Sequence, residues 1–207
     1  LDVIIPRGGA GLIRHIVENS CVPVIETGAG VCHIYVDASA NLSSAIPICV
    51  DAKCQYTAAC NAVEALLVHR NVAEGFLPLL ADAYAAVGVE IRGDERVCAL
   101  IDCKSASQED WGAEYLSPTI FVRVVDSLDE AIDHINRYGS HHTDAILTED
   151  AAAAERFMRL VDSAGVYQNA STRFADGFRY GFGAEVGIST GKLHARGPVG
   201  LDGLVTY

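Results

Sequence analysis

The chain has 207 residues, of which 50% are hydrophobic, and its 27 Asp and Glu against 15 Lys and Arg give a net charge of −12. This length can bury a sizeable core, as one large or two small domains. The acidic balance argues against a nucleic-acid surface, because phosphate binding needs clustered positive charge. No apolar run approaches the ~20 residues of a membrane-spanning helix. We therefore expect neither nucleic acid nor a membrane as a partner.

Hydrophobic patterning predicts strands and helices in alternation. Apolar residues alternate or run continuously in the expected strands and recur at helical spacing in the expected helices. This alternation implies an α/β fold with a mainly parallel sheet flanked by helices. In chain order, we expect strand 2–6, helix 12–19, strand 22–25, strand 33–36, helix 42–52, strand 62–69, helix 71–87, strand 89–92, strand 119–125, helix 128–137, strand 144–147, helix 150–161 and strand 165–168.

Capping residues and composition define the ends of these elements and the loops between them. Asn41 is a suitable N-cap for the helix that follows it, and Ser127 or Asp126 can cap the next helix but one. Residues 93–112 are polar and irregular in pattern, so we expect a long connection there. Residues 177–207 are rich in glycine, and we expect them to be mostly loop.

The seven cysteines form an odd set without the spacing of a disulfide framework, which favours free thiols in a reducing compartment. The first nine residues lack the charged region and cleavage site of a secretory signal, so we expect a cytoplasmic location. Cys54 with Cys60, or Cys98 with Cys103, could suggest zinc ligands. No C-x-x-C pair and no regular histidine pattern accompanies them, so we expect no metal site.

Cys60 is the candidate nucleophile. It lies among alanines just before an apolar stretch, in the run KCQYTAACNAVEALL. A thiol that attacks a carbonyl needs open space, and the resulting oxyanion needs nearby N–H donors. The alanines leave that space, and Asn61 can add a donor. A buried structural thiol is the alternative for a single cysteine, and Cys54 is the rival nucleophile, without such small neighbours.

Three tracts carry a resemblance to a known family. They are KCQYTAACNAVEALL at 53–67, NASTRFADG at 169–177 and GFGAEVGISTGKLHARGPVGL at 181–201. Together they resemble the gamma-glutamyl phosphate reductases, a branch of the aldehyde dehydrogenase superfamily, and the resemblance spans essentially the whole chain. It implies an aldehyde-dehydrogenase-like catalytic domain.

The resemblance also implies how the chain is divided. Residues 1–26 would be the tail of a dinucleotide-binding domain, residues 27–195 the catalytic domain, and residues 196–207 a return segment that leads to an oligomerisation strand. The expected strand at 2–6 has no earlier strand to pair with. We therefore expect that the chain opens inside a larger fold, as the C-terminal half of an enzyme.

By resemblance, the activity is NADPH-dependent reduction of gamma-glutamyl phosphate to glutamate 5-semialdehyde and phosphate in proline biosynthesis, through a thioester on Cys60. The resemblance further implies an NADP(H) cofactor, a homo-oligomer and functional coupling to glutamate 5-kinase, either separate or fused upstream. Two alternatives remain open at this point. One is another aldehyde dehydrogenase, which the tracts NASTRF and HARGPVG disfavour. The other is a truncated chain that binds substrate or a partner without turnover.

Two glutamates are implied on the cofactor side of the site. Glu26, in ETGAG, lies 34 residues before Cys60 and matches the placement of the glutamate that activates water in oxidising aldehyde dehydrogenases. An acyl-phosphate reductase does not need to hydrolyse its thioester, so a general-base role is not implied for Glu26. Glu114, in EYLSP, resembles the E-x-F-G-P glutamate that binds the nicotinamide ribose. A loop carboxylate is the alternative for each.

The substrate-binding candidates lie near the C-terminus, in a segment that is basic within an acidic chain. Asn169 ends a predicted strand, where polar side chains face the ligand crevice of open α/β sheets. Arg173 offers a guanidinium fork for the alpha-carboxylate of a glutamyl substrate, and a surface ion pair is its alternative. Arg196 is a second candidate that could instead anchor a turn, Asn61 is a third, and His194 is expected to be structural.

Overall fold

The computed structural model of the protein describes residues 1–193 and 196–205. His194, and Ala195 at the predicted domain boundary, lie outside the described residues. The helices are α1 (Ala10–Asn19), α2 (Leu42–Cys54), α3 (Arg70–Ala86), α4 (Glu95–Cys98), α5 (Leu128–Tyr138) and α6 (Ala151–Leu160). The strands are β1 (Cys32–Val36), β2 (Val63–His69), β3 (Glu90–Gly93), β4 (Lys104–Ser105), β5 (Thr119–Val125), β6 (Thr143–Leu147), β7 (Gly165–Gln168), β8 (Gly187–Ser189) and β9 (Gly197–Val199). Short 3-10 helices are η1 (Gln108–Gly112), η2 (Thr172–Phe174) and η3 (Leu201–Leu204).

A seven-stranded sheet in the order β4-β3-β5-β2-β1-β6-β7 forms the centre of the described residues. Every neighbouring pair in this sheet is parallel. The central strands are almost entirely apolar and buried, as expected for strands covered on both faces. The α/β fold with a mainly parallel sheet flanked by helices is confirmed.

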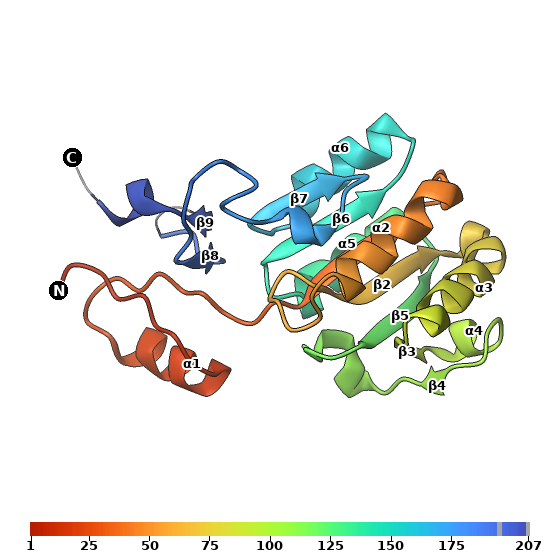
Figure 1. The fold of residues 1–207 in the computed structure, drawn as a ribbon, viewed down its shortest axis with the longest axis horizontal. Coiled ribbons are helices and arrows are strands. Elements are labelled where there is room, and N and C mark those ends of the chain that lie inside the picture. Colours follow the sequence, from red (N-terminus) through yellow and green to blue (C-terminus); the bar gives the residue numbers. More distant parts are fainter. Residues whose placement is uncertain (194–195, 206–207) are drawn as a thin grey trace.

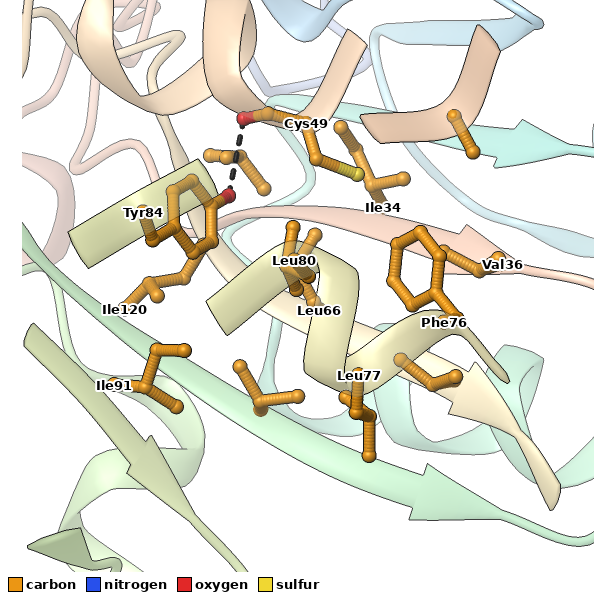
Figure 2. Close-up of a cluster of buried hydrophobic side chains, with 14 of the residues drawn as sticks. Ile34, Val36, Cys49, Leu66, Phe76, Leu77, Leu80, Tyr84, Ile91 and Ile120 are labelled. Atoms are coloured by element: carbon orange, nitrogen blue, oxygen red, sulfur yellow. Dashed lines mark hydrogen bonds between the residues drawn. The ribbon is translucent and has the colours of Figure 1, made fainter. Parts of the chain in front are cut away.

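Helices cover both faces of the sheet (Figure 1). Successive side chains of a strand point to opposite faces, so Ile34 and Val36 pack with α2 and α3, whereas Tyr35 between them packs with α5 and α6. Figure 2 shows the larger core, in which Phe76 and Leu80 of α3 cluster with Cys49 of α2 and with Leu66 of the sheet. This core holds α2 in place, and the loop that carries Cys60 follows directly from its end.

The predicted caps are present where the sequence placed them. Asn41 accepts a hydrogen bond from the Ser43 N–H at 3.1 Å and begins α2. At α5, Ser127 is the cap rather than Asp126, since its hydroxyl accepts from the Glu130 N–H at 3.1 Å. The predicted helices therefore begin within one residue of the expected positions, apart from α1, which begins two residues early, at Ala10 rather than residue 12.

The first predicted βαβ unit is only partly formed. Strands 2–6 and 22–25 are reduced to one parallel bridge between Ile4 and Val24. Pro6 and Pro23 have no N–H to donate to a longer ladder, and in the described residues no other strand pairs with this bridge. Figure 1 shows α1 apart from the seven-stranded sheet and joined to it by one connecting segment.

The long connection expected at 93–112 is partly ordered, which corrects that prediction. Asp94 accepts a hydrogen bond from the Val97 N–H and begins α4, and Ser107 and Asp110 form a capping box around η1. These side-chain caps allow very short elements that hydrophobic periodicity does not reveal. The segment from residue 177 is mostly loop, as expected, with one antiparallel pair, β8 and β9.

Three properties of the described residues bear on the expectations from composition. All seven cysteines are free thiols. In the part of the chain that the structure describes, no helix is both long and apolar enough to cross a membrane. Over the same residues, no group of three or more His, Cys, Asp or Glu side chains is arranged to hold a metal ion.

Candidate active site

Cys60 lies in the loop between α2 and β2, at the amino end of a central strand. The loop is closed by short turns, in which the Ala59 N–H donates to Tyr56 O and the Ala62 N–H donates to Ala59 O. The Cys60 side chain is exposed, so the buried structural thiol is not what the structure shows. Cys54, the rival, is the half-buried last residue of α2.

The ETGAG segment packs directly on the Cys60 backbone. A Cβ at Gly30 would lie 1.6 Å from the Cys60 carbonyl oxygen and 2.7 Å from its Cα, so no larger residue fits there in this conformation. From β1 below, the Cys32 thiol donates to the same carbonyl oxygen, with Sγ at 3.3 Å. Gly30, the second glycine of ETGAG, is therefore required by its contact with the loop at 55–62, which carries Cys60 and is called the nucleophile loop below. A bound phosphate is not needed to explain it.

The charges around Cys60 favour its neutral form. Partial desolvation by the surrounding loop raises the pKa of the Cys60 thiol, and the carboxylates of Glu185 and Glu114 raise it further. Its own backbone N–H and Arg173 lower the pKa by less. Because the thiolate is the nucleophile, attack by Cys60 needs a proton acceptor or additional positive charge at the site.

Glu114 lies against the ETGAG segment, close enough for its charge to act on Cys60. Its Oε1 accepts a hydrogen bond from the Gly30 N–H at 2.6 Å. No hydrogen bond to its Oε2 occurs among residues 1–193 and 196–205, so this half-buried oxygen can still accept one from a ligand. Glu26 is also half-buried, and no hydrogen bond to its carboxylate is found in the described part of the chain. The alternative of a Glu26 carboxylate bonded to backbone amides is therefore not seen.

Asn61 joins the nucleophile loop to the segment that carries Arg173. Its Nδ2 donates to the Ala175 carbonyl oxygen at 2.8 Å, and its side chain is buried. The amide N–H group is thus used within the protein, and a contact of Asn61 with the substrate stays a prediction. Asn61 holds η2 against the loop, and the sequence alone could not show that contact because the two residues are 114 positions apart.

Arg173 points toward the end of α2 near Cys60. Its Nε donates to Gln55 Oε1 at 3.2 Å, and a second guanidinium, that of Arg179, donates to the same oxygen at 3.2 Å. Among the described residues neither arginine has a carboxylate partner within ion-pair distance, so the surface ion pair proposed as the alternative for Arg173 is not formed. The sequence included Arg179 only in the local basic excess and did not single it out.

The Arg196 guanidinium binds other parts of the protein. Its Nη1 lies 2.7 Å from Asp162 Oδ1, and its Nε donates to the Thr190 carbonyl oxygen at 3.0 Å. Lys192 also pairs with Asp162 at 2.9 Å. These contacts fit the alternative of a turn anchor, and the expectation that Arg196 binds substrate stays a prediction.

Asn169 is not brought to Cys60. Its Oδ1 accepts from the Thr148 N–H at 2.9 Å, and its Nδ2 donates to the Thr148 carbonyl oxygen at 3.0 Å. Asn169 follows the carboxyl end of β7, whereas Cys60 precedes the amino end of β2, and all strands of the sheet are parallel. The two residues therefore lie at opposite edges of the sheet. The general rule for α/β crevices predicted the wrong edge for this nucleophile.

A buried ion pair next to the nucleophile loop was missed from the sequence. Lys53 Nζ lies 2.5 Å from Glu64 Oε2, and both side chains are fully buried. The signal in the sequence was weak: two charged residues stand in an otherwise mostly apolar or small run on either side of Cys60. Spacing alone cannot show that they meet inside the protein.

The chain is similar along its whole length to gamma-glutamyl phosphate reductases. It is 59% identical over 207 residues to gamma-glutamyl phosphate reductase 1 of Synechocystis, covering 100% of this chain and 48% of that protein. The crystal structure of the Thermotoga maritima enzyme superposes with a TM-score of 0.97 at 50% identity and covers 100% of this chain and 50% of that one. The family resemblance is therefore confirmed.

The chain thus spans about half the length of the gamma-glutamyl phosphate reductases that it matches. No protein-family profile matches it. An acetylating aldehyde dehydrogenase from Geobacillus thermoglucosidasius, 19% identical with a TM-score of 0.71, covers 95% of this chain and 53% of its own. At that identity the likeness concerns the fold alone, and it confirms the aldehyde-dehydrogenase-like architecture.

Proposed function

We propose that the complete gene product containing this sequence reduces gamma-glutamyl phosphate to glutamate 5-semialdehyde and phosphate in proline biosynthesis. One observation carries the proposal. Cys60 is exposed on a loop against which Gly30 packs and beside which Glu114 lies, in a chain that matches the reductases over its whole length. We also propose the division implied by resemblance, with residues 1–26, 27–195 and 196–207 as cofactor-domain tail, catalytic domain and return segment.

In the proposed mechanism Cys60 acts as the nucleophile. The thiolate attacks the acyl carbon, the S–C bond forms, and the C–O bond to phosphate breaks, which releases phosphate and leaves a thioester on Cys60. A nicotinamide cofactor, which Glu114 and Glu26 would hold, would supply the hydride that reduces this thioester. The resulting thiohemiacetal on Cys60 loses its S–C bond, the sulfur regains a proton, and the aldehyde leaves. The backbone N–H of Cys60, which already lowers the pKa of the thiol, is the donor in place for the oxyanion.

The cofactor-binding proposal rests on Glu114. Gly30 fixes one of its carboxylate oxygens and leaves the other available, which fits a hydrogen bond from a ribose hydroxyl. Glu26 precedes Gly30 by four residues and is proposed as a second residue on the cofactor side. NADP(H) rather than NAD(H) is the part of this proposal that comes from the family alone.

Arg173 is proposed to bind the alpha-carboxylate of the substrate, with Arg179 beside it. Both guanidinium groups lack a carboxylate partner among the described residues, and both converge on one amide oxygen close to Cys60. Two forks of this kind suit a planar carboxylate. Their positive charge would also offset the carboxylates that raise the pKa of Cys60.

The proposed setting is a cytoplasmic homo-oligomer with functional coupling to glutamate 5-kinase. Seven free thiols suit a reducing compartment. The oligomer and the kinase come from the family resemblance.

A phosphate-dependence assay tests the function. The complete gene product is incubated with glutamate 5-semialdehyde and NADP⁺, with and without inorganic phosphate, and NADPH formation is followed. The proposal requires formation that depends on phosphate, since the reverse reaction consumes it. Formation without phosphate would favour an oxidising aldehyde dehydrogenase, and stoichiometric labelling of Cys60 without turnover would favour a binding role.

A further inference from the structure

The buried ion pair of Lys53 and Glu64 closes the loop that carries Cys60. Lys53 lies in the last turn of α2, and Glu64 is the second residue of β2, so the loop runs from one partner to the other. Nζ and Oε2 are 2.5 Å apart, and neither side chain is exposed. The pair therefore joins the two ends of the nucleophile loop inside the protein.

Stability is a weak reason for such a pair. Burial lowers the pKa of Lys53 and raises the pKa of Glu64, because both charges lose water, and their mutual attraction opposes these shifts. Apolar residues of similar volume often replace a buried ion pair with no loss of stability. A contact that an apolar pair could not make is a better explanation of the charges.

That contact is made to the segment that carries Glu114. Glu64 Oε1 accepts a hydrogen bond from the Leu116 N–H at 3.2 Å, while Oε2 faces Lys53. Leu116 has φ of 52°, a left-handed conformation that leucine rarely adopts. Lys53 also lies 5.9 Å from the ring centroid of Tyr115. The pair thus holds the backbone just after Glu114 in an uncommon conformation.

The contacts continue from there to the nucleophile. Glu114 accepts the Gly30 N–H at 2.6 Å, and Gly30 packs on the Cys60 backbone. Lys53 and Glu64 are thus in contact with both structures that must face one another in the reaction, the nucleophile loop and the Glu114 segment. Their side chains have no exposed surface, so they cannot touch the substrate.

We propose that Lys53 and Glu64 are positioning residues for the reductase reaction. Together they hold the Cys60 loop and the segment at 114–116 in a fixed position relative to each other. This inference rests on the proposed function for its activity measurements but not for its measurement of thiol reactivity.

The test compares two variants of the complete gene product. Lys53→Met/Glu64→Met replaces the pair with apolar side chains and removes the acceptor for the Leu116 N–H. Tyr84→Phe is the control, because it removes another buried hydrogen bond to α2, from the Tyr84 hydroxyl to the Cys49 carbonyl oxygen, away from the loop. We expect the double variant to keep its melting temperature but to lose at least about tenfold in kcat. Tyr84→Phe should lower the melting temperature and keep kcat within about twofold.

Coupling to Glu114 provides a second measurement. Glu114→Ala should lower kcat/KM in the wild-type background and have little further effect in Lys53→Met/Glu64→Met, because Glu114 is already misplaced there. Additive losses in a folded double variant would overturn the proposal. A folded double variant that retains wild-type kcat would overturn it as well.

A third measurement needs no reductase activity. The rate at which iodoacetamide alkylates Cys60 is monitored by mass spectrometry, in the absence of cofactor and substrate. Loosening the loop should hydrate the thiol and speed its alkylation at least about threefold in the double variant, with no change in Tyr84→Phe. If the double variant does not fold, Lys53→Met/Glu64→Leu takes its place, since leucine is smaller than methionine's extended chain and likewise gives the Leu116 N–H no acceptor. Equal alkylation rates in wild type and in the folded variant would overturn the proposal.

Discussion

At the scale of single residues, the site combines an exposed thiol with opposing charges. Glu185 and Glu114 raise the pKa of Cys60, and Arg173 lowers it. Among the described residues, Arg173 and Arg179 have no carboxylate partner, so we expect their positive charge to be available to an anionic ligand.

Replacement of Cys60 by serine should abolish the activity, because a serine hydroxyl is a far weaker nucleophile than a thiolate at neutral pH. We expect a loss of roughly 10³-fold or more in kcat for Cys60→Ser in the complete gene product. Cys54→Ser is the matched control and should retain most activity, since Cys54 ends α2 outside the loop. Phosphate-dependent NADPH formation measures both, and near-normal turnover of Cys60→Ser would contradict the covalent mechanism.

Arg173→Lys should raise the KM for glutamate 5-semialdehyde, because lysine keeps the charge but loses the planar fork. Arg173→Ala should cost about 2–5 kcal/mol in kcat/KM, as for a severed charge pair. Arg159→Ala, on the exposed side of α6, is the control and should change neither value. A straight-chain aldehyde without the amino-acid end should be a poor substrate that responds little to these variants. Equal losses on both aldehydes would assign Arg173 to the fold.

At the scale of elements, the site is built where three segments meet at the amino edge of the sheet. The nucleophile loop precedes β2, the ETGAG segment precedes β1, and the Glu114 segment precedes β5. Because β1, β2 and β5 are neighbours in a parallel sheet, the segments that precede them lie side by side. The order and the parallel direction of these strands therefore bring the three segments of the site together.

Gly30→Ala should displace the nucleophile loop, since the added Cβ would overlap the Cys60 carbonyl oxygen. We expect a loss of about 1–3 kcal/mol in the free energy of unfolding, as for overpacking, and a larger relative loss of activity. Gly28→Ala is the matched control within the same motif, because the nearest atom to its Cβ is Glu26 Oε1 at 4.0 Å. Urea unfolding and kcat measure both variants. Similar behaviour of the two alanines would contradict the close-contact argument.

At the scale of the whole molecule, Asp162 joins the C-terminal segment to the sheet. It accepts from Lys192 and Arg196, and these hydrogen bonds lower the pKa of the Asp162 carboxyl to about 2. A lowered pKa in the folded state means that the contribution to stability is present above the unfolded pKa of ~3.9 and is lost as the pH falls toward the folded value.

Wild type should therefore melt at a higher temperature than Asp162→Asn at pH 7, and the difference should shrink between about pH 4 and pH 2. Thermal unfolding followed by circular dichroism over this range measures it. Asp129→Asn is a useful comparison, because Asp129 pairs with Arg156 within the helical layer and not with the C-terminal segment. A constant difference between wild type and Asp162→Asn at all pH values would contradict the role of the charge.

The sequence by itself determined the alternation of strands and helices, most of their caps and the resemblance to the reductases, and it predicted Cys60 as the nucleophile. These features are local. Hydrophobic periodicity fixes which residues can bury one face of an element, and a cap such as Asn41 or Ser127 acts within three residues. Cys60 could be proposed as the nucleophile because its small neighbours stand next to it in the chain, and the family could be proposed because its tracts are continuous.

Only the tertiary structure decided which distant residues meet. In the folded protein Lys53 pairs with Glu64, and Gly30 packs on the backbone of Cys60. Arg196 pairs with Asp162, and Asn169 lies at the edge of the sheet opposite to Cys60. The short strands at the N-terminus also depended on a partner strand rather than on their own pattern. Contacts of this kind follow from strand order and from the edge of the sheet at which each loop emerges, and neither property is encoded in the spacing of residues along one segment.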